Sequence, residues 1–449
     1  MTFKMESVPI QIGTRRRRRF AARASTPPVV VALAVYVFVV IGRVPDAFPS
    51  VHLAIVTAGI TGVLALLGSN RDLGRILRIP ETQAVLALFG LSIVTIPFSV
   101  WPGQSLTFVT RSYITLIFLF FVIVYCARSA RAVQILLYGL LAAMLLLEIS
   151  LMLWGKGDRL LVTNTYDSND IAFIMVCGFP LGAMWFLRGR GPGRYIAALT
   201  SALAVTTILL TSSRGGLVSL CVVLALLLVR ASSRQRMGTA VVVLACVLIL
   251  GAFGSKEYWE RMATIWDSGG GPAVSAYDAT GVWGARWPIW RASLWLMLEH
   301  PVIGVGAGVF DIAEGLSHGG AGKWSTAHNA FLQIGVELGI PGLVLFIFLL
   351  YRTVKNCHIV MRLARQRPQL SVEAWLASGV ELSLYGFIVA AFSLSQAYSS
   401  MLYLLVAISV VLARLASQRN RVPGPRGAGS PGGVAGFSGR GADGAEHAL

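Results

Sequence analysis

The sequence predicts an all-α polytopic membrane protein with about 12 transmembrane helices. Of its 449 residues, 55% are hydrophobic and only 13% are charged, whereas about a quarter of the residues of a soluble domain are charged. The apolar residues also come in successive runs, most of them close to the roughly 20 residues that a helical span requires. Composition and run length together therefore predict a multi-pass integral membrane protein.

Twelve apolar runs follow one another along the chain, and the runs at 28–42 and 216–229 are short for a membrane span. The runs lie near residues 28–42, 51–68, 83–100, 113–127, 132–154, 171–187, 195–211, 216–229, 238–253, 330–351, 376–396 and 401–415. The long polar stretch between the ninth and tenth runs predicts an outer loop with short interfacial helices.

This pattern divides the chain into five regions. They are a basic cytoplasmic N-terminus (1–27), transmembrane helices 1–9 (28–253), a long periplasmic loop (254–329), transmembrane helices 10–12 (330–415) and a cytoplasmic tail (416–449). We expect the tail to be disordered, because it is rich in Gly, Pro and Arg and has no hydrophobic periodicity.

The basic residues predict the orientation. If the arginine run 15–19 is cytoplasmic, most of the 38 Lys and Arg residues fall on cytoplasmic connections, as the positive-inside rule requires. We therefore expect a bacterial inner-membrane protein with both termini in the cytoplasm and a site that faces the periplasm. The net charge of +18 does not indicate nucleic-acid binding, because the surplus is spread over many membrane edges.

The outer loop carries the first candidate residues. Residues 287–299 predict a helix that ends at His300-Pro301, and its three tryptophans favour the membrane interface. Arg286 and Arg291 accompany them, and guanidinium groups bind phosphate as a bidentate fork. The stretch Gly304–Gly308 lacks the strand and acidic residue of a dinucleotide site, so we expect it to be a flexible turn.

Two further candidates lie at the outer ends of predicted spans. Arg214 occupies a tight outer turn, where it is either functional or an arginine that snorkels to the interface. His328 precedes a polar stripe of Asn329, Gln333 and Glu337, which share one helical face. A histidine in this position suits a base that activates an acceptor near neutral pH.

The sequence resembles the family of O-antigen ligases and the related O-antigen and exopolysaccharide polymerases. Four pieces within residues 165–350 carry the resemblance. They are Asp167 to Ala172, Ser213-Arg214-Gly215, Arg286 and Trp290 running to Pro301, Gly304 and Gly306, and His328-Asn329 followed by Gly339 and Gly342.

The resemblance implies a metal-independent glycosyltransferase without a cofactor. Its donor is a glycan on undecaprenyl pyrophosphate, its acceptor is a sugar hydroxyl of the lipid A core or of the growing polymer, and membrane lipids surround it. Arg214 and Arg286 correspond to arginines that hold the diphosphate, and His328 to the histidine that orients or deprotonates the acceptor. Leu343 stands where ligases often have Thr, which leaves ligase and polymerase both open.

Further residues complete the predicted site as substrate-binding groups. They are Arg291, Asn329, Asp167, Asn169, Asp170 and Glu337. The acidic pair Asp167 and Asp170 suits an amino sugar or a divalent ion, but two carboxylates alone rarely hold a metal.

The alternative class is a 12-helix secondary transporter. Glu148 and Glu381 are its candidates for mid-membrane charges. Transporters seldom place a long loop with His and Arg on the outer side, so the sequence favours the enzyme.

Overall fold

The computed structural model describes residues 28–68, 73–154, 166–230, 259, 281–317 and 324–421, with the side chains of 281–285 and 421 left aside. Every regular element in these ranges is a helix. Eight of the helices are long and apolar enough to cross a membrane. The prediction of an all-α polytopic membrane protein is confirmed at this level.

Eleven of the twelve predicted runs coincide with a helix, and the run at 238–253 lies outside the described residues. These helices are α2 (Pro28–Ile41), α4 (Leu53–Gly68), α6 (Pro80–Val94), α8 (Ile114–Cys126), α9 (Ala130–Trp154), α10 (Ser168–Arg188), α11 (Gly193–Leu210), α12 (Arg214–Arg230), α17 (Ala330–Gln366), α18 (Ser371–Ala391) and α19 (Ser400–Arg421). Helices satisfy their own backbone hydrogen bonds, which a lipid environment demands.

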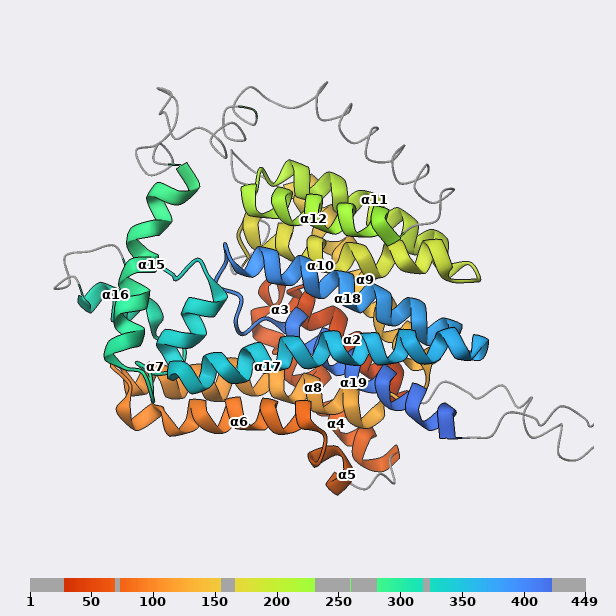
Figure 1. Cartoon of the computed structure of the whole chain (residues 1–449), viewed down its shortest axis with the longest axis horizontal. Coiled ribbons are helices and arrows are strands. Elements are labelled where there is room, and N and C mark those ends of the chain that lie inside the picture. The colour runs from red at the N-terminus through yellow and green to blue at the C-terminus, as the bar shows by residue number, and fades with distance from the viewer. Residues whose placement is uncertain are drawn as a thin grey trace, which may run out of the picture.

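Short elements connect these helices. They are α3 (Val44–Ala47), η1 (Pro49–Val51), α5 (Leu73–Leu77), η2 (Ile96–Phe98), α7 (Pro102–Thr107), the π-helix η3 (Phe108–Tyr113), α15 (Gly281–Glu299), α16 (Phe310–Ser317) and η4 (Pro368–Leu370). Figure 1 shows α15 and α16 gathered at one end of the bundle, and α5 with the last turns of α17 and α19 toward the other end. We call these the α15 end and the α5 end.

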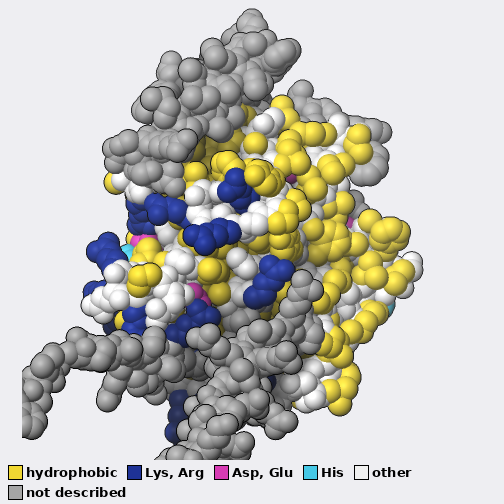
Figure 2. Space-filling model, turned by 90° about the vertical axis from the view of Figure 1, so that its right-hand side faces the viewer, with side chains coloured by type: hydrophobic (Ala, Val, Ile, Leu, Met, Phe, Trp, Pro, Cys, Tyr) yellow, Lys and Arg dark blue, Asp and Glu magenta, His cyan; other side chains and the backbone are white. Residues whose placement is uncertain are grey.

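Burial separates central from peripheral helices. The membrane windows of α10 and α19 are each 83% buried, whereas that of the stretch Pro49–Gly68, which contains α4, is only 11% buried. Exposed side chains such as Ile55 and Leu66 therefore present an apolar surface that suits lipid. Figure 2 looks toward the α5 end and shows Lys and Arg side chains beside a broad hydrophobic surface.

The helix that follows His328 differs from its prediction. The predicted span 330–351 continues as α17 to Gln366, so the connection expected to begin at 352 is helical for its first four turns. Near its start α17 is broken at Gly339, where φ is 68° and ψ is −173°. A backbone with positive φ suits glycine, and Pro341 lies two residues farther along.

Two further boundaries were predicted wrongly. The interfacial helix α15 begins at Gly281 and not at 287, so Pro288 lies inside it. The end at Glu299 is confirmed. Helix α18 ends at Ala391, and residues 392–399, predicted in part as membrane span, form a largely irregular connection to α19. This connection becomes important because it borders the candidate site.

Candidate functional site

A cavity of about 570 Å³ brings together residues from five separate parts of the chain. The segment before α10 contributes Asp167 and α10 itself Asp170, and the segment before α17 contributes His328. Two arginines, Arg43 and Arg111, complete the charged part of the wall. The α18–α19 connection supplies Leu394, Ser395, Gln396, Tyr398 and Ser399.

His328 adopts a strained backbone at the edge of this cavity. Its φ is 45°, which is uncommon for a residue with a side chain. Its backbone N–H donates to Ser395 Oγ at 2.9 Å, and Thr326 Oγ1 lies 3.4 Å from its Nε2. Strain of this kind persists only where neighbouring contacts hold it, and it often marks a functional site.

The imidazole of His328 is held in its neutral form. Burial, followed by the positive charge of Arg286, lowers the pKa of His328 to about 4, while Asp167 acts in the opposite direction. A neutral imidazole has a ring nitrogen that accepts a proton. At neutral pH the side chain is therefore ready to act as a base or as a hydrogen-bond acceptor.

The acidic pair is part of a helix cap. Asp167 is the N-cap of α10, and its Oδ1 accepts from the backbone N–H groups of Asn169 and Asp170, both at 2.8 Å. Asp170 closes a capping box with Asp167 and accepts from Gln396 Nε2 at 2.7 Å. These bonds hold both carboxylates at the cavity wall and connect α10 to the α18–α19 connection.

The two arginines of the wall were missed by the sequence analysis. Arg43 follows α2 with a φ of 51°, and its guanidinium lies over the Tyr166 ring, 4.6 Å from the centroid. Arg111 lies in η3, just before α8. Both are cations at predicted outer ends of spans, which is the signal that singled out Arg214. The same argument applied to every outer arginine would have found them.

The predicted arginines lie around the cavity but do not line it. Arg214 begins α12, and the preceding Ser213 donates to Asn169 Oδ1 at 2.8 Å. Asn169 therefore joins this turn to the start of α10. Arg286 is near enough to His328 to lower its pKa, whereas Arg291 lies farther along α15.

The polar stripe behind His328 joins three segments. Asn329 is the N-cap of α17 and accepts from the N–H groups of Phe331 and Leu332 at 2.9 and 3.1 Å. Gln333 Oε1 accepts from the N–H of Ala397 at 3.3 Å, and the buried Glu337 accepts from the N–H of Gly308 at 2.9 Å. Asn329 and Glu337 thus have structural partners, and neither lines the cavity.

The glycine-rich stretch 304–308 is closely packed, so the expected flexible turn is wrong. The N–H of Gly306 donates to the Glu337 carbonyl at 3.0 Å, and that of Val305 to the Val336 carbonyl at 2.9 Å. Gly304, Gly306 and Gly308 all have positive φ. A Cβ on Gly304 would collide with the Glu337 carbonyl, and one on Gly306 with the Ser99 side chain. The stretch holds the broken start of α17 in place.

The two glutamates of the transporter alternative lie elsewhere. Glu381 accepts from Arg230 at 2.8 and 3.0 Å and contacts His358 Nε2 at 2.8 Å. Glu148 is fully buried in α9, and its carboxyl oxygens have no hydrogen-bond partner in the described structure. Neither residue lines the cavity that contains His328.

Comparison with known families favours the enzyme over the transporter. The family described as O-Antigen ligase matches residues 199–347. Residues 199–347, about a third of the chain, are thus similar to the O-antigen ligase family. The match covers α12, α15 and the first part of α17, and it includes Arg214, Arg286 and His328. No curated protein matches the chain.

The match supports a glycosyltransferase-like membrane function, with a lipid-linked glycan and an acceptor glycan as partners in general. Much of the cavity wall, including Arg43, Arg111 and the acidic pair, lies outside the matched residues. Among the residues that the structure describes, no group of three or more His, Cys, Asp or Glu side chains lies in an arrangement that suits a metal ion.

Proposed function

We propose that this protein transfers an oligo- or polysaccharide from undecaprenyl pyrophosphate to a sugar hydroxyl at the outer face of the cytoplasmic membrane. One observation carries the proposal: a neutral histidine, two arginines and two carboxylates line a single cavity. The family match supports the reaction class, and the cavity supplies the groups that such a transfer requires.

The arginines stabilise the leaving group. Transfer breaks the bond between the anomeric carbon and the diphosphate oxygen, and negative charge then develops on the departing lipid diphosphate. Guanidinium groups match that charge with bidentate hydrogen bonds. We assign diphosphate binding to Arg111 and Arg43 in the wall, together with Arg286 and Arg214 beside it, and we keep Arg291 as an auxiliary cation.

His328 provides for the acceptor. The acceptor oxygen forms a bond to the anomeric carbon, and its proton passes to a ring nitrogen of the neutral imidazole. Ser395 holds the backbone of His328 through the 2.9 Å hydrogen bond, which orients the ring toward the cavity. Asp167, Asn169 and Asp170 remain proposed contacts for sugar hydroxyl or amino groups, whereas Asn329 and Glu337 act through the support of α17.

The apolar part of the wall contacts the hydrocarbon chain of the lipid carrier. Val40 of α2, Ala54 of α4 and Leu116 of α8 line the same cavity as His328. Since α4 is the least buried of the long helices, lipid reaches this side of the cavity. We propose that the isoprenoid chain lies against α2, α4 and α8 while its diphosphate contacts the arginines.

The experiment uses purified full-length protein with a lipid-linked glycan donor and an acceptor. His328→Ala should abolish transfer and leave donor binding intact, because the arginines remain. His300→Ala is the matched control, since His300 is exposed just after the end of α15. An active His328→Ala enzyme would remove this residue from catalysis.

Two further measurements test the finer parts of the proposal. Assay with and without a chelator tests metal independence, and chelator-sensitive transfer would move the chemistry toward Asp167 and Asp170. Gel analysis of surface glycans from a deletion strain separates the two family activities. Loss of ligation leaves finished polymer on the lipid carrier, whereas loss of polymerisation leaves single repeat units.

A further inference from the structure

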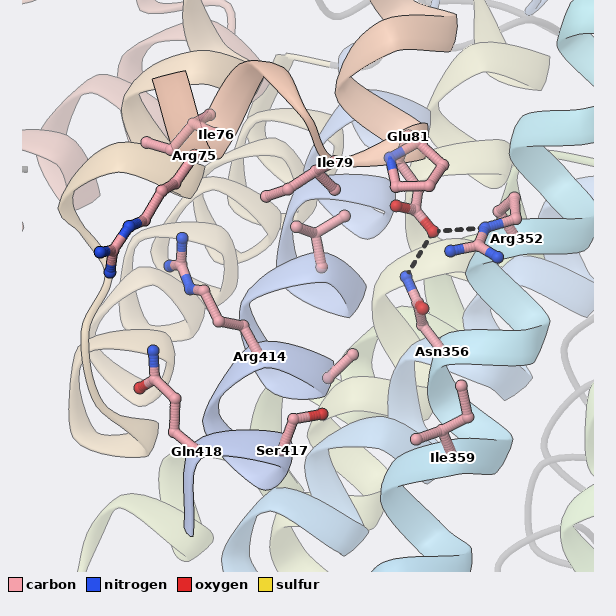
Figure 3. A pocket seen from close by; sticks show the side chains of 13 residues that line it. Arg75, Ile76, Ile79, Glu81, Arg352, Asn356, Ile359, Arg414, Ser417 and Gln418 are labelled. Atoms are coloured by element: carbon pink, nitrogen blue, oxygen red, sulfur yellow. Dashed lines mark hydrogen bonds and ion pairs between the residues drawn. The ribbon is translucent and has the colours of Figure 1, made fainter. Parts of the chain in front are cut away.

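A second cavity, of about 600 Å³, is lined by residues of α5 and its neighbours (Figure 3), and none of them lines the His328 cavity. Its wall is built from α5, α6, α17 and α19. The function proposed above uses none of its residues. Three of the described side chains that line it are arginines, Arg75, Arg352 and Arg414, and one is a carboxylate, Glu81.

The single carboxylate is already matched within the wall. Glu81 is buried, and its Oε1 accepts from Arg352 Nε at 2.7 Å and from Asn356 Nδ2 at 3.0 Å. Figure 3 shows this group on one side of the cavity, with Arg75 and Arg414 facing each other on the opposite side. Among the described side chains of the wall, three guanidinium groups therefore stand against one carboxylate, and Arg75 and Arg414 lie on the side away from it.

Arg414 is held in position from behind. Its Nη2 donates to the carbonyls of Val124 at 2.9 Å and Ala127 at 3.1 Å, at the end of α8. A guanidinium fixed in this way loses less side-chain freedom when it binds a ligand. Arg75 approaches from the short helix α5, which is exposed. The arrangement suits an anionic group with several acceptor oxygens.

The remaining wall is apolar and adjoins lipid-facing surface. Ile76, Ile79 and Val410 line the cavity, while Leu73 and Leu77 beside Arg75 are 54% and 39% exposed. A purely hydrophilic anion makes no favourable contact with this apolar part of the wall. A molecule with a phosphate at one end and hydrocarbon at the other matches both the basic and the apolar parts.

We propose that this cavity binds the phosphate-bearing headgroup of an anionic glycerophospholipid, with its acyl chains against the exposed face of α5. The basic residues predict that this end faces the cytoplasm, and basic pockets between transmembrane helices on that side bind such headgroups. The site is distinct from the His328 cavity, and its test does not depend on glycan transfer.

The test measures lipid binding by full-length protein in a neutral detergent, with native mass spectrometry as the readout and phosphatidylglycerol as the probe. Wild-type protein should retain phosphatidylglycerol over phosphatidylcholine. Arg75→Gln should weaken binding at least about tenfold, since a charge-assisted contact is lost. Arg78→Gln is the control, because Arg78 is exposed three residues away and does not line the cavity.

A second variant keeps the arginines and introduces a negative charge that repels an anionic headgroup. Gln418 lines the cavity and is exposed, so Gln418→Glu should fold and also weaken binding, whereas Gln366→Glu at the exposed end of α17 should not. Wild-type affinity in both Arg75→Gln and Gln418→Glu would overturn the proposal. Inorganic phosphate that displaces the lipid at equal concentration would also overturn it, because the site would then recognise free phosphate alone.

Discussion

The neutral state of His328 makes a sharp prediction for the pH dependence of transfer. Burial and the charge of Arg286 lower the pKa of His328 to about 4, from an ordinary value of about 6.5. A base must be unprotonated to accept the acceptor proton, so a lowered pKa extends activity to lower pH. Activity is lost only as the pH falls through the lowered value.

The size of the effect is large at mildly acidic pH. At pH 5.5 an imidazole with a pKa of about 4 is roughly 97% neutral, whereas one with a pKa of about 6.5 is roughly 9% neutral. Wild-type enzyme should therefore keep nearly all of its kcat/KM at pH 5.5, about tenfold more than an unperturbed histidine allows. Since kcat/KM reports the free enzyme, this parameter is the one to measure.

The assay is the initial rate of glycan transfer between pH 4 and 8, with subsaturating lipid-linked donor. Arg286→Gln should move the acidic limb upward, because a repulsive positive charge is removed, yet not fully to 6.5, because burial remains. His300→Gln should leave the limb in place. A wild-type limb centred near pH 6.5 would show that His328 is an ordinary histidine and refute the reasoning.

Three other predictions follow from the geometry. Arg111→Lys and Arg286→Lys should each lower transfer at least about tenfold while the proteins still insert, because a point charge replaces a bidentate group. Transfer assays on purified protein measure this effect. Unchanged rates would exclude both residues from diphosphate binding. Gly306→Ala should lower the free energy of unfolding by roughly 2–3 kcal/mol, because its Cβ would meet the Ser99 side chain and φ is 109° at this residue. Gly90→Ala is the control, because a Cβ there meets nothing within 4 Å. Thermal unfolding in detergent compares the two variants. A reporter fused after Arg365 should be active only on the cytoplasmic side, and periplasmic activity would invert the proposed orientation.

The sequence predicted the helical class because lipid imposes one strong rule. A span must be apolar over about 20 residues, so composition and run length locate the helices, as α9 and α10 illustrate. Helix ends are less well predicted because no such rule governs them. The basic residues 352–366 indicate a cytoplasmic connection, yet the chain remains helical to Gln366, since a helix extends into water without penalty.

The sequence singles out candidate site residues where a residue is unusual in its local surroundings. His328 and Arg214 stand out against an apolar background, and the same test would have identified Arg43 and Arg111. The Ser395 contact had no such signal, because a serine in a predicted span is ordinary. This contact becomes visible only in the structure, where the α18–α19 connection lies close to His328.

The hydrogen bonds around the start of α17 fix the segment that places the proposed base, His328, just before this broken helix. The break at Gly339 and the packed glycines at 304–308 hold the start of α17 from one side. The polar stripe joins that short segment to Ala397, and Ser395 holds the backbone of His328. A ring with few rotatable bonds on a backbone fixed at both sides loses little freedom when substrate binds, and such preorganisation favours transfer. We therefore propose that Glu337, which accepts from the N–H of Gly308, supports the position of His328 through the start of α17.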